Sequence, residues 1–228
     1  MPSVLGSAVA GHITASATLT ISFALGAGSN RVVYVGISTG GNGTAISGVT
    51  YDSDALTELY DDAGGPTFAH IALYRIVEAD GLATGTADVV VTAASATDIS
   101  AIVVAVQDVD QTTPNDAVDS ANFDDGSSAN TISSATGDLV VEFAAMGDPS
   151  SATTANTELA DDYFVTSNIL IVAQSAAGAA SVVLDWTPSQ APGWYRSVAV
   201  NVNAASGGGG GGELPFITQL DAVWARGS

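Results

Sequence analysis

Residues 18–25 read TLTISFAL and residues 138–146 read DLVVEFAAM, and these two stretches decide the fold class. In the first, large apolar residues alternate with threonine, serine or alanine. The second repeats the alternation, with Asp138 and Glu142 on the face opposite Phe143. Side chains of a strand point alternately to its two faces, so a period of two residues predicts strands with one apolar and one polar face.

Further short runs have the same β-branched character and are separated by clusters of glycine, aspartate, asparagine and serine. No stretch before residue 204 has an apolar stripe with helical spacing. Residues 54–62 (DALTELYDD) fit one helical turn or a strand and a turn, and we favour the latter. Many strands without helices predict an all-β fold, and we expect one antiparallel β-sandwich of roughly eight to twelve strands. The further runs are residues 31–38, 68–77, 87–94, 99–109, 168–174, 180–186 and 195–203.

The composition divides the chain into three parts. Residues 1–203 hold all the strand-like runs and form the predicted sandwich domain, since none of their turns is long enough to be a linker. Residues 204–212 include six consecutive glycines and are a flexible linker. Such a linker spans roughly 15 Å as a coil. Residues 213–228 then form a C-terminal arm.

The arm carries apolar residues at the spacing of a short amphipathic helix. A helix of about ten residues is marginal in water, so we expect it to order only against a partner. Two alternatives remain open: the arm folds back onto its own sandwich, or it has no fixed structure. Tryptophan and phenylalanine are frequent anchors of protein interfaces, which favours a binding role. The predicted partner-binding residues are Phe216, Ile217, Leu220, Val223 and Trp224.

The charge is strongly acidic and excludes several partners. The chain has 24 acidic residues, four arginines and no lysine, which gives a formal net charge of −20. Nucleic acid and anionic membranes need clustered basic residues, so we expect neither as a partner. The charge suits solubility or adaptation to salty water. Cysteine is absent, and the sequence has neither a secretory signal nor an apolar run of spanning length, so we expect a soluble protein made without export.

Candidate catalytic residues are few. Residues 36–40 (GISTG) match the nucleophile-elbow pattern around Ser38, but a glycine-rich, strand-like stretch follows where that motif needs a helix. His70 alternates with apolar residues, and we expect it half-buried or at a rim. Glu142 is the one glutamate within a clear strand, so a carboxylate pair for glycoside hydrolysis has weak support. We therefore predict no enzyme.

We expect no cofactor, although acidic loops leave calcium open as a ligand, because calcium takes oxygen ligands from such loops. The loop carboxylates are Asp52, Asp54, Asp61, Asp62, Asp124 and Asp125. Arg75 and Arg196 alternate with apolar residues, and we expect Arg196 at the edge of the core against a carboxylate.

Three stretches together resemble a known module: GVTYDSDALTEL (48–59), QDVDQTTPNDAV (107–118) and SSATGDLVVEFAAMGD (133–148). Over about residues 10–203 the chain is similar to a jelly-roll or concanavalin-like β-sandwich module. This module recurs in virion proteins of tailed phages and in some bacterial surface proteins. The resemblance implies a jelly-roll-like sandwich in an exposed structural context and supplies no catalytic residues.

These observations predict a non-enzymatic structural protein of a phage virion, a head decoration or head-fibre subunit on the virion surface, assembled in the host cytoplasm. Its partners would be the major capsid protein or a neighbouring copy, and we expect a homo-oligomer. The alternative is a glycan- or host-surface-binding module of a tail or cell-surface protein. That alternative needs exposed aromatic residues on the loops, for which Tyr60, Phe123 and Tyr163 are the candidates.

Overall fold

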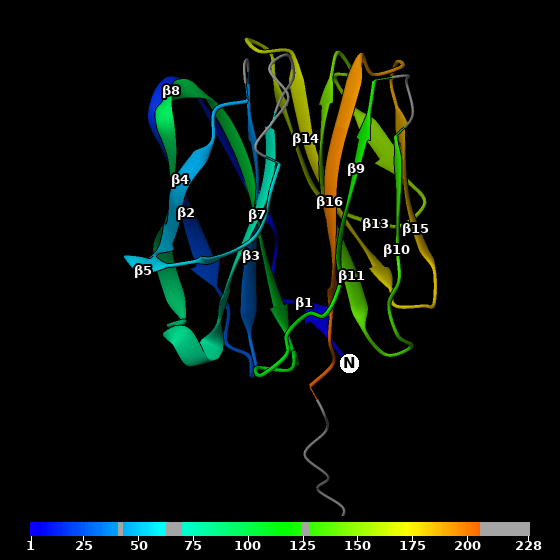
Figure 1. Cartoon of the computed structure of the whole chain (residues 1–228). Helices are drawn as coiled ribbons and strands as arrows, with labels where there is room; N and C mark the ends of the chain where they lie inside the picture. The colour runs from blue at the N-terminus through cyan, green and yellow to red at the C-terminus, as the bar shows by residue number, and fades with distance from the viewer. Residues whose placement is uncertain (41–42, 63–69, 125–127, 206–228) are drawn as a thin grey trace, which may run out of the picture.

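The computed structural model describes residues 1–40, 43–62, 70–124 and 128–205. Figure 1 shows strands stacked in layers, and the strand pairs of these residues are antiparallel. The same residues contain no α-helix and one turn of 3-10 helix, η1 (Glu78–Asp80). The predicted all-β antiparallel sandwich is therefore confirmed. No helix in this described part is long and apolar enough to cross a membrane.

The described residues form sixteen strands, so the expectation of eight to twelve was wrong. Three of the strands have only two or three residues and are too short to show an alternating pattern, which explains part of the difference. The strands are β1 (Ser3–Val4), β2 (Val9–Leu25), β3 (Val32–Thr39), β4 (Ile46–Tyr51), β5 (Asp54–Ala55), β6 (Thr57–Asp61), β7 (His70–Val77), β8 (Gly85–Gln107), β9 (Val118–Phe123), β10 (Ala129–Ile132), β11 (Leu139–Gly147), β12 (Ala152–Thr154), β13 (Thr157–Phe164), β14 (Ile169–Ala177), β15 (Val182–Pro188) and β16 (Trp194–Val202).

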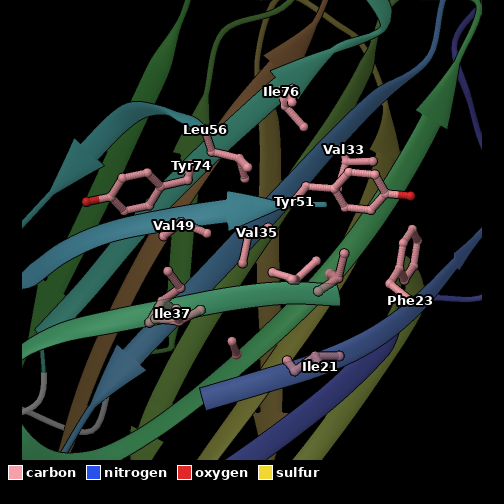
Figure 2. Close-up of a cluster of buried hydrophobic side chains, with 14 of the residues drawn as sticks. Ile21, Phe23, Val33, Val35, Ile37, Val49, Tyr51, Leu56, Tyr74 and Ile76 are labelled. Carbon is pink, nitrogen blue, oxygen red and sulfur yellow. The ribbon is translucent and has the colours of Figure 1, made fainter. Parts of the chain in front are cut away.

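The first half of the chain forms one eight-stranded sheet that bends over itself. Its order is β5-β4-β8-β3-β7-β6, and β1 and β2 also pair with β8. The start of β8 pairs with β4 and the end of β2, whereas its later part pairs with β3, β1 and the start of β2. Register shifts in β2 between Ile13 and Thr18 mark the bend. The two limbs of the bent sheet enclose the first core, in which Val35, Leu56 and Tyr74 lie close together (Figure 2).

The second half adds a five-stranded sheet, β13-β14-β11-β16-β9, and a three-stranded sheet, β10-β15-β12. A second core lies between the five-stranded sheet and the β3–β7–β8 surface of the first sheet. Two smaller clusters lie between the five-stranded and three-stranded sheets. The stack thus has four layers: the two limbs of the first sheet, the five-stranded sheet and the three-stranded sheet. Buried side chains fill each of the three spaces between these layers, and β11 is covered on both faces. Glu142, expected on a polar face, is consequently fully buried.

The two halves of the chain repeat one strand topology. In residues 9–107, β3 lies between β7 and the end of β8, with β6 beyond β7. In residues 118–202, β11 lies between β14 and β16, with β13 beyond β14. The outermost layers of the two halves also correspond. In the first half the start of β8 lies between β2 and β4, and in the second half β15 lies between β10 and β12. The long strands β2 and β8 are each represented by two separate strands in the second half.

The repeated topology is accompanied by a repeated sequence motif that the sequence analysis missed. Residues 57–62 read TELYDD and residues 157–162 read TELADD. Both lie on edge strands, and both have a register shift after the glutamate. Residues 84–91 (TGTADVVV) likewise correspond to residues 177–184 (AGAASVVL). Bulges and charged side chains on an edge strand discourage pairing with another sheet, which gives the repeated motif a structural role.

Candidate functional site

The predicted partner-binding residues lie outside the part of the chain that the structure describes. The set is Phe216, Ile217, Leu220, Val223 and Trp224. The described chain ends at Ala205, whose backbone N–H donates to the Asp108 carbonyl at 2.8 Å, next to a bridge between Val109 and Ala204. Since β1 pairs with the last residues of β8, the N-terminal strand and the exit toward the arm lie at one end of the stack (Figure 1).

Ser38, the candidate nucleophile, lies within a regular strand. It is buried in β3 and pairs with Ile71 on β7 and Ser100 on β8. A nucleophile elbow instead turns sharply from a strand into a helix. Packing explains why residue 36, the first of the motif, is glycine, because a Cβ there would lie 2.2 Å from the Phe143 ring. The glycine lets the two halves of the chain approach closely across the second core.

His70 is fully buried, and the expectation of a half-buried or rim position was wrong. It lies at the start of β7 on the face that Tyr74 shares, as the alternation predicted. Its Nε2 atom pairs with the carboxylate of Asp61 on the neighbouring strand. Ser38 pairs with Ile71, whose side chain belongs to the second core, so Ser38 and His70 point to opposite faces of the sheet. The two side chains do not form a nucleophile–base pair.

The acidic loops use several carboxylates within the fold. Asp61 pairs with His70, and Asp124 accepts from Arg196 Nη1 at 2.9 Å. Asp125 lies outside the described residues. Among the residues that are described, no group of three or more Asp, Glu or His side chains is placed to hold a metal ion.

Arg196 lies where the sequence predicted, at the edge of the core and against a carboxylate. Besides the Asp124 contact, its Nη1 donates to the backbone carbonyls of Phe123 and Tyr195. These bonds join β9 to β16 and the loop after β9. Arg75 likewise donates to the Asn115 side chain. Both arginines therefore have structural roles in the described fold.

Arg31 is a buried charge that the sequence analysis did not single out. Its guanidinium bonds Glu78 at 2.7 and 3.0 Å and also donates to Gly26 O, Leu82 O and Thr84 Oγ1. Burial alone would raise the pKa of Glu78, but the bonds from Arg31 outweigh it, and the pKa is lowered. The pair fixes η1 and the following loop against the start of β3.

The three aromatic residues considered for glycan binding are half-buried and have internal contacts. Tyr60 packs on the second core, and Phe123 and Tyr163 pack on the cluster around Trp186. The Phe123 ring stacks on Tyr195 with 6.1 Å between ring centroids. The Tyr163 hydroxyl donates to Asn168 at 2.7 Å. They lie on three different strands, β6, β9 and β13, and none projects freely as a platform for a sugar ring.

A buried carboxylate centre is the most unusual polar feature of the described fold. Glu142 lies on β11, fully buried between the five-stranded and three-stranded sheets. Its Oε2 atom accepts from Gln174 Nε2 at 2.6 Å and from Trp186 Nε1 at 3.0 Å. Its Oε1 atom accepts from the Tyr195 hydroxyl at 2.9 Å. Three neutral donors on three different strands therefore converge on one carboxylate.

The surroundings of Glu142 change its acidity. Burial raises its pKa from 4.5 to about 7, while the hydrogen bonds from Gln174, Tyr195 and Trp186 act in the opposite direction. Burial, and then the nearby Glu142 carboxylate, also raise the pKa of the Tyr195 hydroxyl. None of the four ion pairs found among the described residues includes Glu142. The carboxylate is held by dipoles alone, without a cation.

The centre is connected to the surface through Gln174. The Gln174 Oε1 atom accepts from Thr154 Oγ1 at 2.5 Å and from Asn156 Nδ2 at 2.9 Å. Asn156 is half-buried and lines a hollow of about 400 Å³ at the edge of the sandwich, with Ser175 and Val183. A chain of hydrogen bonds thus runs from this hollow to the buried acid.

The corresponding position in the first half is apolar. Glu142 pairs with Gln174 and Ala199 in the ladders of β11, and Val35 pairs with Tyr74 and Val103 in those of β3. Val35 belongs to the first core. The topology can therefore be built with valine at this position. The sequence analysis missed the centre because one glutamate in an alternating run resembles a solvent-facing residue.

Comparison with known proteins gives no relative from which a function could be transferred. No family model, no curated protein and no solved structure matches the chain.

Proposed function

We propose that this chain is a non-enzymatic structural protein of a phage virion, a head decoration or head-fibre subunit. The C-terminal arm, residues 213–228, holds it to a neighbouring virion protein, either the major capsid protein or another copy. The proposal places the protein on the virion surface as part of a homo-oligomeric array. It rests on the sequence of the arm, on the resemblance to phage sandwich modules and on the arrangement of the described fold.

The observation that carries the proposal is the position of the chain exit. Ala205 and β1 lie at one end of the four-layer stack, so the linker and arm start from that end (Figure 1). A subunit tethered there would present the opposite end away from the surface to which it is attached. A tether of this kind raises the effective concentration of the arm near its binding site, which suits a lattice of repeated sites.

Two further observations support a structural rather than catalytic role. Ser38 and His70 point to opposite faces of one sheet. The described arginines are engaged by carboxylates, amides or backbone carbonyls within the fold. An acidic surface with a net charge of −20 also keeps subunits apart until a specific contact joins them.

Deletion of residues 207–228 tests the proposal. We expect the truncated protein to fold and to lose incorporation into particles, measured by mass spectrometry of purified virions. A matched variant with Phe216, Leu220 and Trp224 replaced by alanine keeps the length of the arm and should fail in the same way. Full occupancy of particles by either variant would contradict the role of the arm. A glycan-binding module, in contrast, would keep its ligand after truncation.

A further inference from the structure

The two halves of the chain differ most in two connections between strands. We call the region that these connections cover the corner of each half. In the first half, residues 78–84 connect β7 to β8 and include η1. In the second half, only residues 178–181 connect β14 to β15. The connection from β4 to β6 is also longer than the connection from β12 to β13, because it contains β5. The second half therefore lacks two segments that cover this corner in the first.

Those extra segments fill the corner of the first half with apolar side chains. Leu56, just before β6, and Leu82, after η1, are both buried in the first core. Figure 2 shows Leu56 beside Tyr74 and directed into that core. The interior of the first half is thereby closed by its own chain.

The same corner of the second half is open. The motif LTEL at residues 56–59 corresponds to NTEL at residues 156–159, so Asn156 takes the place of Leu56. No segment of the described second half corresponds to the one that carries Leu82. The hollow of about 400 Å³ lies there, lined by Asn156, Ser175, Ala177, Ala179, Ser181 and Val183 among others. This volume is within the range of pockets that hold a ligand or an aromatic side chain.

The lining is uncharged, and most of its exposed surface is polar. None of the residues around the hollow carries a charge, so an apolar group could enter without desolvating an ion. Val183 is 56% exposed and is one of three exposed large hydrophobic residues among those described. Asn156 and the serines add hydrogen-bonding groups at the rim. The hollow can therefore receive an amphipathic segment that brings both ring carbons and an N–H donor.

The exit of the chain lies close to this hollow. Ala204 N–H donates to Asp138 Oδ1 at 3.0 Å, and the Asp138 carbonyl accepts from Gly178 N–H at 3.0 Å. Gly178 immediately precedes Ala179, which lines the hollow. The seven residues 206–212 separate Ala205 from the arm. A flexible glycine-rich chain of this length spans roughly 15 Å on average, so the arm begins within reach of the hollow.

We propose that residues 213–228 dock in this hollow of their own chain, where their apolar side chains do what Leu56 and Leu82 do in the first half. Docking within one chain is favoured in dilute solution, because the tether keeps the arm at a far higher effective concentration than any other chain. This inference goes beyond the proposed function and does not depend on it, because it concerns the isolated protein.

Disulfide trapping tests the docking, since the chain has no cysteine of its own. The full-length Val183→Cys/Gln219→Cys variant places one thiol at the hollow and one on a polar position of the arm. The control, Val165→Cys/Gln219→Cys, uses a second exposed valine, which lies beyond the opposite end of β14. Both valines are exposed, so neither substitution should disturb folding. Adding Trp224→Ala to the hollow variant tests whether the arm docks through its anchor residue.

We expect the hollow variant to form an intramolecular disulfide at least about tenfold faster than the control, seen as a monomer with altered mobility on a non-reducing gel. This ratio corresponds to about 1.4 kcal/mol of preference for the docked arm. The Trp224→Ala change should bring the rate down to that of the control. Equal rates in the two variants would overturn the proposal. So would trapping that occurs only between chains when Val183→Cys and Gln219→Cys proteins are mixed, because the arm would then occupy a neighbour.

Discussion

Replacing Glu142 with glutamine should abolish a pH dependence of stability that the buried carboxylate creates. In the folded protein Glu142 keeps its proton up to a pKa of about 7, whereas the ordinary pKa of a glutamate side chain is 4.5. The folded state therefore binds more protons than the unfolded state between these two values. Stability from this group is greatest below pH 4.5 and is lost as the pH rises through about 7.

The magnitude follows from the difference between the two pKa values. Each unit is worth about 1.4 kcal/mol, so the full change across this interval is about 3 kcal/mol. Glu142 is fully buried, so solvent screening does not reduce this figure much, and we take it as an upper limit. Comparison with a variant isolates the contribution of this one group. The informative quantity is therefore the difference in unfolding free energy between Glu142→Gln and wild type at each pH.

Glutamine fits the site because the donors are arranged unevenly. Oε2 of Glu142 accepts two N–H groups, from Gln174 and Trp186, whereas Oε1 accepts from the Tyr195 hydroxyl. A glutamine amide can put its oxygen toward the two N–H donors and its NH₂ group toward Tyr195, whose hydroxyl can accept as well as donate. We expect the variant to fold and to lose only the titrating charge.

Urea unfolding at pH 5, 6, 7 and 8, followed by tryptophan fluorescence, measures the effect. The advantage of Glu142→Gln over wild type should grow by about 2.5 kcal/mol from pH 5 to pH 8. Glu158→Gln removes a charge from the exposed edge strand β13 and serves as the control, with an expected curve parallel to wild type. A Glu142→Gln difference that stays constant over this range, within about 0.5 kcal/mol, would refute the reasoning.

Two substitutions test the packing and the polar contacts of the stack. Gly36→Ala would put a Cβ 2.2 Å from the Phe143 ring and should cost about 3 kcal/mol of unfolding free energy, whereas Gly48→Ala, with open space around it, should cost less than about 1 kcal/mol in the same denaturation assay. If Gly36→Ala and Gly48→Ala cost the same unfolding free energy, the sheet that contains β3 and the sheet that contains β11 can move apart easily to accommodate the added methyl group. Arg196→Ala removes the bond to Asp124 and two bonds to carbonyl groups, and we expect a loss of about 1–2 kcal/mol. An unchanged melting temperature would show that Arg196 contributes nothing.

The alternation in runs such as residues 18–25 was sufficient to predict the fold class, because each strand follows locally from its own residues. The number of layers was not predictable in the same way. Whether a strand is covered on one face or both depends on which sheet packs against it, and that packing joins residues far apart in the chain. Glu142 shows the consequence: its neighbours Gln174, Trp186 and Tyr195 lie more than thirty residues away. A self-comparison of the sequence would have found TELYDD and TELADD and hence the duplication.

Comparison of the two halves distinguishes residues that the shared topology requires from residues that occur in one half alone. Val35 and Glu142 have equivalent places in the same topology, as do Leu56 and Asn156. Because the first half packs with apolar residues at both places, the fold by itself requires neither a buried acid nor an open corner. These differences lie on the side of the second half where the chain leaves toward its arm. A general demand of the sandwich would have affected both halves alike, so the buried acid and the hollow are features of the second half and are not requirements of the shared topology.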